Sequence, residues 1–190
     1  MRMADTARID RLLELATETG ALKFGEFKLS SGKKSSYYFD GRLLSLHPEG
    51  INLISDAMLE IVSPLNLNAV GGPTLAADPI VAGICLKSFF IGGKLSGFIV
   101  RKEAKQHGMS QLIEGTLEIK DEVLIVDDTC TTGGSLFHAI NAVQELGGIV
   151  KKVMVVLDRN EGGSKTLIDQ GFDFEALITV NEDGKFIVNH

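Results

Sequence analysis

An uninterrupted apolar run, Val123 to Val126, leads directly into two acids, Asp127 and Asp128. Four consecutive apolar residues without polar alternation are typical of a strand that is buried on both faces of a sheet. A short segment rich in threonine and glycine follows, and a helix is predicted from about Gly134. A strand, a glycine-containing loop and a helix in this order predict one strand–helix unit of an α/β protein.

The same alternation of strand and helix continues along the chain. Helices are expected over 6–19, from Pro48, over about 78–88, over 134–146 and over about 163–170. Strands are expected over 24–29, 37–39, 69–71, 97–100, 123–127, 153–157 and 174–180, and a last hairpin should turn at Asp183–Gly184. Apolar strands that alternate with helices predict a parallel-sheet core flanked by helices. We expect a single domain, residues 1–190, in which an N-terminal helix and hairpin (about 1–45, called the hood) lie on a core (about 46–190).

Composition excludes several classes of protein. The 190 residues suffice for one domain with a sizeable core, and 44% hydrophobic with 23% charged residues is ordinary for a globular protein. A net charge of −6 without a long basic tract argues against nucleic-acid binding. No segment has the length or apolarity of a membrane span or a signal peptide. The two cysteines, Cys85 and Cys130, have no metal-type spacing and form no disulfide framework. We therefore expect a cytoplasmic protein.

The twin acids and the loop behind them have the chemistry of a ligand site. Backbone N–H groups at a helix N-terminus bind phosphate, and carboxylates beside them can hold sugar hydroxyls, or magnesium through water. A buried strand followed by a glycine-rich helix entry occurs in many α/β proteins without such a role. Two adjacent buried acids, however, are costly unless a cation or hydrogen-bond donors accompany them. The segment therefore predicts a site for a sugar phosphate.

Residues 123–135, VLIVDDTCTTGGS, resemble at every position the motif with which type I phosphoribosyltransferases bind phosphoribosyl diphosphate (PRPP). The resemblance implies the fold of that family, a loop that cradles the 5′-phosphate, and acids that face the ribose hydroxyls. It also implies Mg²⁺ as the cofactor, held by Asp127 and Asp128 through water. The implied PRPP-binding residues of this segment are Asp127, Asp128, Thr129, Thr131, Thr132, Gly133, Gly134 and Ser135.

A second cluster, RKEAKQHG, follows the strand expected at 97–100. It places four basic-type residues within seven positions of an acidic chain: Arg101, Lys102, Lys105 and His107. A solvated surface loop has the same composition, but beside a phosphate site such a cluster can stabilise a diphosphate leaving group and exclude water. The cluster resembles the catalytic loop of orotate phosphoribosyltransferases. That resemblance implies that the four residues bind PRPP, that Lys105 is catalytic, and that the loop serves the neighbouring subunit of a homodimer with shared active sites.

Two further segments resemble the same family, namely LKFGEFKLSSGKKSSYYF at 22–39 and LDRNEGG at 157–163. They imply an orotate pocket in which Arg159 meets the orotate carboxylate. The implied orotate-binding residues are Lys23, Tyr38, Phe39, Thr131 and Arg159. For the two aromatic residues, a role as core residues of the hairpin is an equally good interpretation. The sequence departs from the family at Ser30 and Ala76, where many members have a lysine; Lys28 is a possible substitute for the first, and backbone N–H groups for the second.

Together these patterns predict an enzyme that transfers 5-phosphoribose from PRPP to orotate, giving orotidine 5′-phosphate and diphosphate in de novo pyrimidine (UMP) biosynthesis. Asp127, Asp128 and Lys105 are the expected catalytic residues. One alternative is a phosphoribosyltransferase for another base, such as a purine, against which Arg159 counts. The other is a non-catalytic regulator that senses PRPP, against which the acidic composition and the intact basic loop count.

Overall fold

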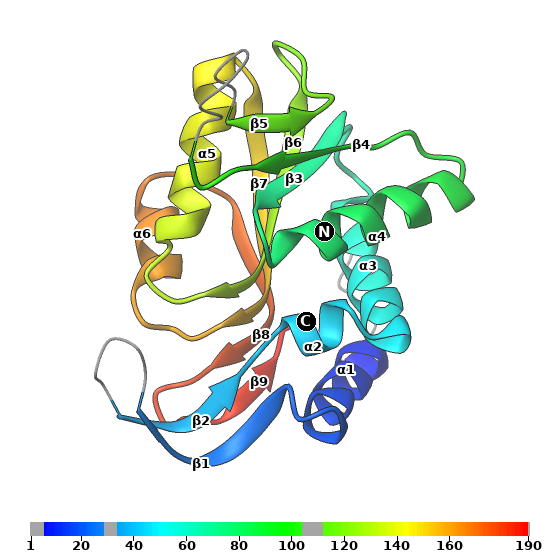
Figure 1. The fold of residues 1–190 in the computed structure, drawn as a ribbon. Helices are drawn as coiled ribbons and strands as arrows, with labels where there is room; N and C mark the ends of the chain where they lie inside the picture. The colour runs from blue at the N-terminus through cyan, green and yellow to red at the C-terminus, as the bar shows by residue number, and fades with distance from the viewer. Residues whose placement is uncertain (1–5, 29–33, 104–111, 190) are drawn as a thin grey trace.

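A mostly parallel sheet organises the computed structural model, which describes residues 6–28, 34–103 and 112–189 (Figure 1). Within those residues the sheet has seven strands in the order β5-β4-β3-β6-β7-β8-β9. The parallel strands are β3 (Ala69–Pro73), β4 (Ser96–Val100), β6 (Glu122–Cys130), β7 (Ile149–Asp158) and β8 (Phe174–Val180). The antiparallel edge strands are β5 (Ile113–Gly115) and β9 (Phe186–Val188). The predicted fold class is confirmed.

Helices cover both faces of this sheet (Figure 1). One face carries α1 (Thr6–Glu18), α3 (Pro48–Val62) and α4 (Ala77–Phe90), and the other carries α5 (Gly134–Leu146) and α6 (Gly163–Asp169). The hood also contains the hairpin of β1 (Leu22–Lys28) and β2 (Lys34–Phe39), followed by the short α2 (Arg42–Ser45). None of the described helices is long and apolar enough to cross a bilayer.

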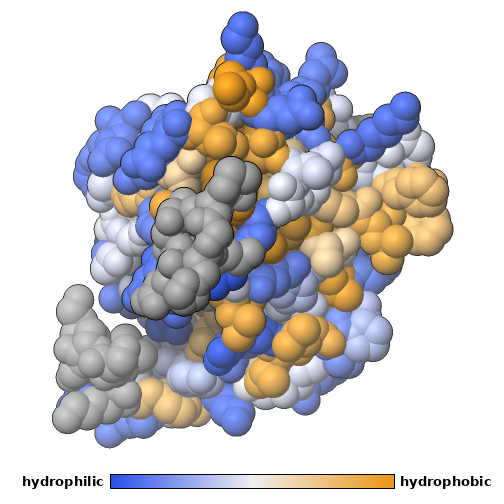
Figure 2. Space-filling model, turned by 45° about the horizontal axis from the view of Figure 1, so that its top comes forward, coloured by the Kyte–Doolittle hydropathy of each residue, from blue (hydrophilic) through white to orange (hydrophobic). Residues whose placement is uncertain are grey.

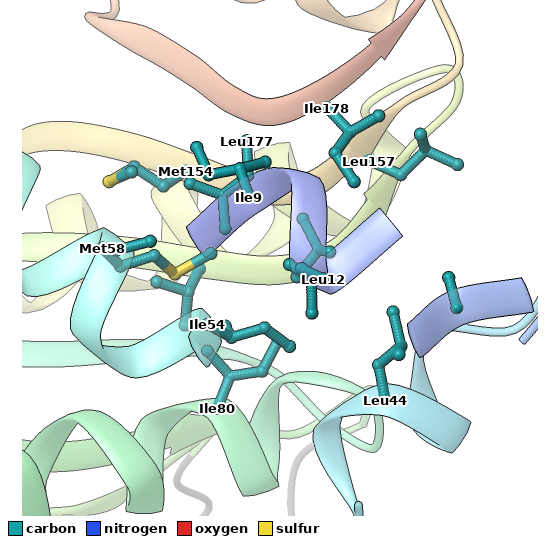
Figure 3. Packing of buried hydrophobic residues seen from close by; sticks show 14 of the residues in the cluster. Ile9, Leu12, Leu44, Ile54, Met58, Ile80, Met154, Leu157, Leu177 and Ile178 are labelled. Atoms are coloured by element: carbon teal, nitrogen blue, oxygen red, sulfur yellow. The ribbon is translucent and has the colours of Figure 1, made fainter. Parts of the chain in front are cut away.

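The central strand β6 divides the hydrophobic core into two layers because its side chains alternate between the faces. Leu124 and Val126 pack in the layer beneath α1, α3 and α4, whereas Val123 and Ile125 pack beneath α5 and α6. All four are fully buried, and burial of each such side chain contributes about 1.5–3 kcal/mol. Figure 3 shows the first layer, in which Ile9 of α1 lies close to side chains of α3 and of the sheet.

The hood shares this core and is also held by ion pairs. Arg11 of α1 contacts Glu49 of α3 at 2.7 Å, and Arg8 contacts Glu60 at 2.7 Å. Ring stacking ties the hairpin to the C-terminal strand, since Tyr37 packs edge-on against Phe186 of β9 with centroids 5.0 Å apart. The hood therefore has a fixed position over the carboxyl ends of the parallel strands.

Several elements differ from the sequence prediction, including β2 and β7, which begin at Lys34 and Ile149 instead of 37 and 153. The strand expected at 123–127 continues to Cys130, so the twin acids lie inside a strand and not behind it. Pairing with β7 extends that far, because Thr129 and Cys130 lie opposite Leu157 and Asp158. The loop expected after Val100 contains β5, and α2 was not predicted, since three- and four-residue elements are too short to show periodicity.

Candidate active site

Asp127 lies at the carboxyl end of β6 with only 5% of its surface exposed. Both of its carboxylate oxygens accept hydrogen bonds. Oδ1 accepts from the backbone N–H of Asp128 at 2.9 Å, and Oδ2 accepts from the hydroxyl of Ser135 at 2.8 Å. The carboxylate is thus oriented by its own strand and by the first turn of α5.

The pKa values of both acids lie above their ordinary value. Burial, followed by the charge of Asp128, raises the pKa of Asp127 to about 7, against the hydrogen bond from Ser135. Burial also raises the pKa of Asp128, and the charge of Asp40 adds to this effect, whereas a hydrogen bond from Thr129 opposes it. A site with these properties favours a ligand that brings hydroxyl donors or a cation.

The segment behind the acids forms an anion-binding helix entry. Gly133 precedes α5 with φ 81°, a backbone conformation that side-chain-bearing residues rarely adopt. The first bond of the helix runs from the N–H of Phe137 to the carbonyl of Gly133 at 2.9 Å. The N–H groups of Gly134, Ser135 and Leu136 consequently have no acceptor within the helix, and they can donate to a phosphate at its positive end.

A cavity of 360 Å³ opens over the acids, between β6, the hood and the N-terminal end of α4. Its lining residues are Tyr38, Phe39, Asp40, Arg42, Pro73, Thr74, Leu75, Ala76, Lys102, Asp127, Asp128, Thr129 and Ser135. The hood approaches closely at Gly41, where an added Cβ would lie 2.6 Å from Cβ of Asp128. Segments from four parts of the chain therefore enclose the acid pair.

The loop before α4 contributes backbone more than charge. Ala76 is the N-cap of α4, and its side chain makes no capping hydrogen bond. Asp78 lies one residue inside the helix and accepts a hydrogen bond from the hydroxyl of Thr74 at 2.9 Å. A side chain usually caps a helix from a residue with extended backbone, whereas Ala76 has helical backbone angles. Thr74, Leu75 and Ala76 line the cavity, and the substitution of backbone N–H groups for the missing lysine stays a prediction.

Of the four basic residues of the predicted loop, the structure describes Arg101 and Lys102. Lys102 lines the cavity together with Asp127 of the same chain. Arg101 contacts Glu114 at 3.3 Å and lines an adjoining cavity of 620 Å³, which also includes Lys102 and Asp78. Lys105 and His107 lie outside the described residues.

The predicted orotate residues fall in three places. Tyr38 and Phe39 both line the cavity, but Phe39 is also a buried core residue, whereas Tyr38 is largely exposed. Lys23 pairs with Tyr38 across the hairpin. Of the described residues, Lys23, Thr131 and Arg159 are not among those that line this cavity.

Arg159 instead packs over an aromatic ring that the sequence interpretation did not select. Its guanidinium carbon lies 5.2 Å from the ring centroid of Tyr37, a cation–π contact. Burial raises the pKa of the Tyr37 hydroxyl, an effect that the charge of Arg159 opposes. Strand alternation gave the signal that was missed, since Tyr37 and Phe39 share the inward face of β2.

The sequence interpretation also missed an ion pair at the mouth of the cavity. Arg42 donates from Nε to Oδ1 of Asp40 at 2.8 Å and from Nη2 to Oδ2 at 2.9 Å. This two-point contact holds the pKa of Asp40 below its ordinary value. Asp40 directly follows β2 and Arg42 is the first residue of α2, where no motif marked them.

A buried and a half-buried acid that lead into an N–H-rich helix entry, at the carboxyl edge of a parallel sheet, are the arrangement expected of a PRPP motif. It places the chain among the type I phosphoribosyltransferases. Curated relatives then narrow the class. An orotate phosphoribosyltransferase of Rhodopirellula baltica is 43% identical over 173 residues, which cover 88% of this chain and 90% of that protein. One of Aquifex aeolicus is 42% identical over 156 residues, which cover 82% and 85%. The chain belongs to the orotate phosphoribosyltransferase family.

Solved structures agree with this assignment. Mycobacterium tuberculosis orotate phosphoribosyltransferase in complex with Fe(III) dicitrate matches with a TM-score of 0.78 and 35% identity, over 91% of this chain and 97% of that chain. The same enzyme in complex with PRPP matches with a TM-score of 0.74 and 32% identity, over 90% and 96%. An adenine phosphoribosyltransferase of Thermoanaerobacter pseudethanolicus, at 18% identity, shares the fold (TM-score 0.64, over 88% and 99%). No family model matches the chain. The predicted family and its activity in pyrimidine biosynthesis are confirmed.

Proposed function

We propose that the cavity over Asp127 and Asp128 binds PRPP and that the chain transfers its 5-phosphoribosyl group to orotate, releasing diphosphate. The observation that carries this proposal is the buried Asp127, with the half-buried Asp128 next to it, beside the α5 N-terminus. The acids accept from the ribose hydroxyls, while the N–H groups that follow Gly133 hold the 5′-phosphate. As the bond from C1 to the diphosphate breaks, the carboxylates favour the positive charge that develops on the sugar ring.

Diphosphate departure requires positive charge on the opposite side of the cavity. Lys102 supplies one such charge from the same chain, close to the N-terminal end of α4. Arg101, Lys105 and His107 complete the proposed set, as the family resemblance implies. The N-terminal end of α4 adds the partial positive charge of its unpaired N–H groups, which compensates in part for the absence of a lysine at Ala76.

For orotate, we propose that Arg159 binds the carboxylate with its planar fork and thereby selects orotate over uracil. The guanidinium carbon lies 5.2 Å from the ring centroid of Tyr37, and this cation–π contact helps to hold the side chain in place. Tyr38, Phe39, Lys23 and Thr131 are the remaining proposed contacts. Orotate brings an anionic ring nitrogen, so the transfer needs no strong protein base.

The acid pair fits Mg²⁺ as a cofactor held through water. This ion favours one or two carboxylates together with substrate oxygens and retained waters. Asp127 and Asp128 supply two carboxylates, and within the described residues no group of three or more His, Cys, Asp or Glu side chains could hold a metal. The residues thus fit an ion that arrives with PRPP better than one that is permanently bound. Bound magnesium would neutralise charge on the diphosphate.

An exposed apolar face supports a homodimer with shared active sites. The exposed residues at the end of α4, together with one beside the cavity, are each between 58% and 75% exposed: Leu75, Leu86, Phe89, Phe90 and Ile91. Figure 2 shows apolar surface at the right edge, where α4 ends. These residues expose on the order of 600 Å² of apolar area, at the upper limit for a monomer and close to one partner's share of a standard interface. Leu75 lines the cavity at the opposite end of α4, roughly 20 Å from Phe90, so a second copy that covers the length of α4 would lie beside the active site.

Sedimentation tests the dimer. Phe89→Lys combined with Phe90→Lys should convert a two-chain species to one chain, whereas Ile168→Lys, at an exposed apolar residue of α6, should not. Equal mass for both variants would remove this face from the proposal.

Two unpaired thiols in the described residues, with Cys130 buried, suit the reducing cytoplasm, which is where we place the protein.

An ultraviolet assay tests the activity. Protein, Mg²⁺ and PRPP are mixed with orotate, uracil or a purine, and the spectrum of each base is followed. Loss of orotate absorbance with none for uracil is expected. Turnover of a purine alone would contradict the proposal, and PRPP binding without turnover of any base would indicate a sensor.

A further inference from the structure

His138 connects the phosphate-binding helix to the residue at which the basic cluster begins. It lies in the second turn of α5, and its Nε2 is 2.8 Å from the backbone carbonyl of Arg101, 37 positions earlier in the chain. A carbonyl oxygen can only accept a hydrogen bond, so Nε2 carries a proton and donates. Neither the PRPP motif nor the proposed mechanism uses this side chain.

Hydrogen bonds hold the two consecutive peptide units on either side of the Arg101 Cα atom. The N–H of Arg101 donates to the carbonyl of Leu112 at 2.8 Å, which continues the ladder between β4 and β5. The carbonyl of Arg101 belongs to the same planar unit as the N–H of Lys102. Because His138 holds this carbonyl, it sets the direction in which the chain leaves β4 and enters Lys102.

Lys102 follows this fixed unit and lines the cavity beside Asp127 and Ser135. Lys102 is exposed, and its side chain has four rotatable bonds. The orientation of its backbone therefore decides how often the ammonium group lies over the cavity. We propose that His138 is a positioning residue that directs Lys102 toward the diphosphate. The inference rests on the proposed function, and it names a residue that contacts no substrate.

Core packing does not explain a histidine here. The buried residues of α5 are Leu136, Ala139, Ile140, Ala142 and Val143, and His138 is not among them. A half-buried position of this kind accepts many side chains, but only a donor of suitable length reaches the carbonyl of Arg101. Glutamine retains an N–H donor at nearly the same distance from the backbone, whereas leucine keeps the volume and loses the donor.

The test measures binding of inorganic diphosphate with Mg²⁺, and of PRPP, by calorimetry. His138→Leu should weaken diphosphate binding about three- to tenfold, the scale of one lost hydrogen bond, and His138→Gln should recover most of it. His138→Ala provides a second variant without a donor, and thermal melts establish that each variant folds. Orotate affinity should change less than about twofold in all of them, within the error of additivity.

A double-mutant cycle separates positioning from general structural damage. If His138 acts through Lys102, His138→Leu should have no further effect on diphosphate binding in a Lys102→Ala protein. An undiminished effect in that background, or unchanged diphosphate binding in both His138→Leu and His138→Ala, would overturn the inference alone. Failure of the unmodified protein to bind PRPP would overturn the proposed function as well.

Discussion

Replacing Asp127 by asparagine should stabilise the folded protein at neutral and alkaline pH while abolishing turnover. Asparagine keeps the shape of the side chain: its carbonyl can accept from the N–H of Asp128, and its amide can donate to Ser135. The substitution therefore retains both contacts seen at 2.9 and 2.8 Å and removes only the buried charge.

The magnitude follows from the proton affinity of the buried carboxyl. Its pKa lies near 7 in the folded protein and at its ordinary value of 3.8 when exposed. Between these values the unfolded chain has released the proton and the folded chain still holds it, so folding stability falls as the pH rises from about 4 to 7. Above pH 7 the accumulated difference is constant at about 4 kcal/mol. The asparagine variant lacks this pH-dependent loss.

Urea unfolding at pH 5, 6, 7 and 8 measures the effect. The variant's gain over the unmodified protein should be about 1–2 kcal/mol at pH 5 and should grow to about 4 kcal/mol at pH 8. For a chain of this length each kcal/mol raises the melting temperature by about 2–4 °C. Asp10→Asn, at an exposed position of α1, is the matched control and should show no such trend. A gain that does not increase between pH 5 and pH 8 would refute the reasoning.

Three further changes test other parts of the structure. Gly41→Ala would place a methyl group 2.6 Å from Cβ of Asp128, so we expect a loss of about 1–3 kcal/mol in urea unfolding together with reduced turnover; unchanged values for both would contradict the close approach. Lys152→Met leaves the two carboxylates that contact this buried lysine unpaired, so the free energy of unfolding should fall by about 2–3 kcal/mol while turnover persists. The loss is smaller than for a fully buried pair because both carboxylates are partly exposed. If active sites are shared, inactive Lys105→Ala and inactive Asp127→Asn proteins should recover activity after subunit exchange, and confirmed heterodimers without activity would assign each loop to its own subunit.

Local signals in the sequence were sufficient for most of the fold. The helix over 134–146 was predicted with its observed bounds because glycines mark both of its ends. The start of α3 was likewise predicted from Pro48, which suits the first turn of a helix. The extent of β6 beyond Asp127 could not be predicted, because polar residues ended the apolar pattern while pairing with β7 continued.

The site was predicted where one continuous segment builds it and missed where distant segments meet. The acids and the helix entry lie within thirteen consecutive residues, and a pattern in the sequence suffices to find them. The contact between Arg159 and Tyr37 depends on how the hood lies over the sheet. No local sequence pattern predicts such a contact, because each of the two residues is of a common type for the strand or loop in which it lies.

The cost of Asp127 and its function have the same physical origin. A carboxylate that could be replaced by asparagine with a gain in stability persists only where the charge is used, since native proteins retain costly polar groups chiefly at functional sites. In the free protein the cost appears as a raised pKa. When PRPP brings hydroxyl donors and a cation, the charged form becomes favourable and the proton leaves. Binding of PRPP should consequently release protons near pH 6 and tighten as the pH rises toward 8. Calorimetry in buffers of different ionisation enthalpy measures that release, and its absence would show that Asp127 does not face the substrate.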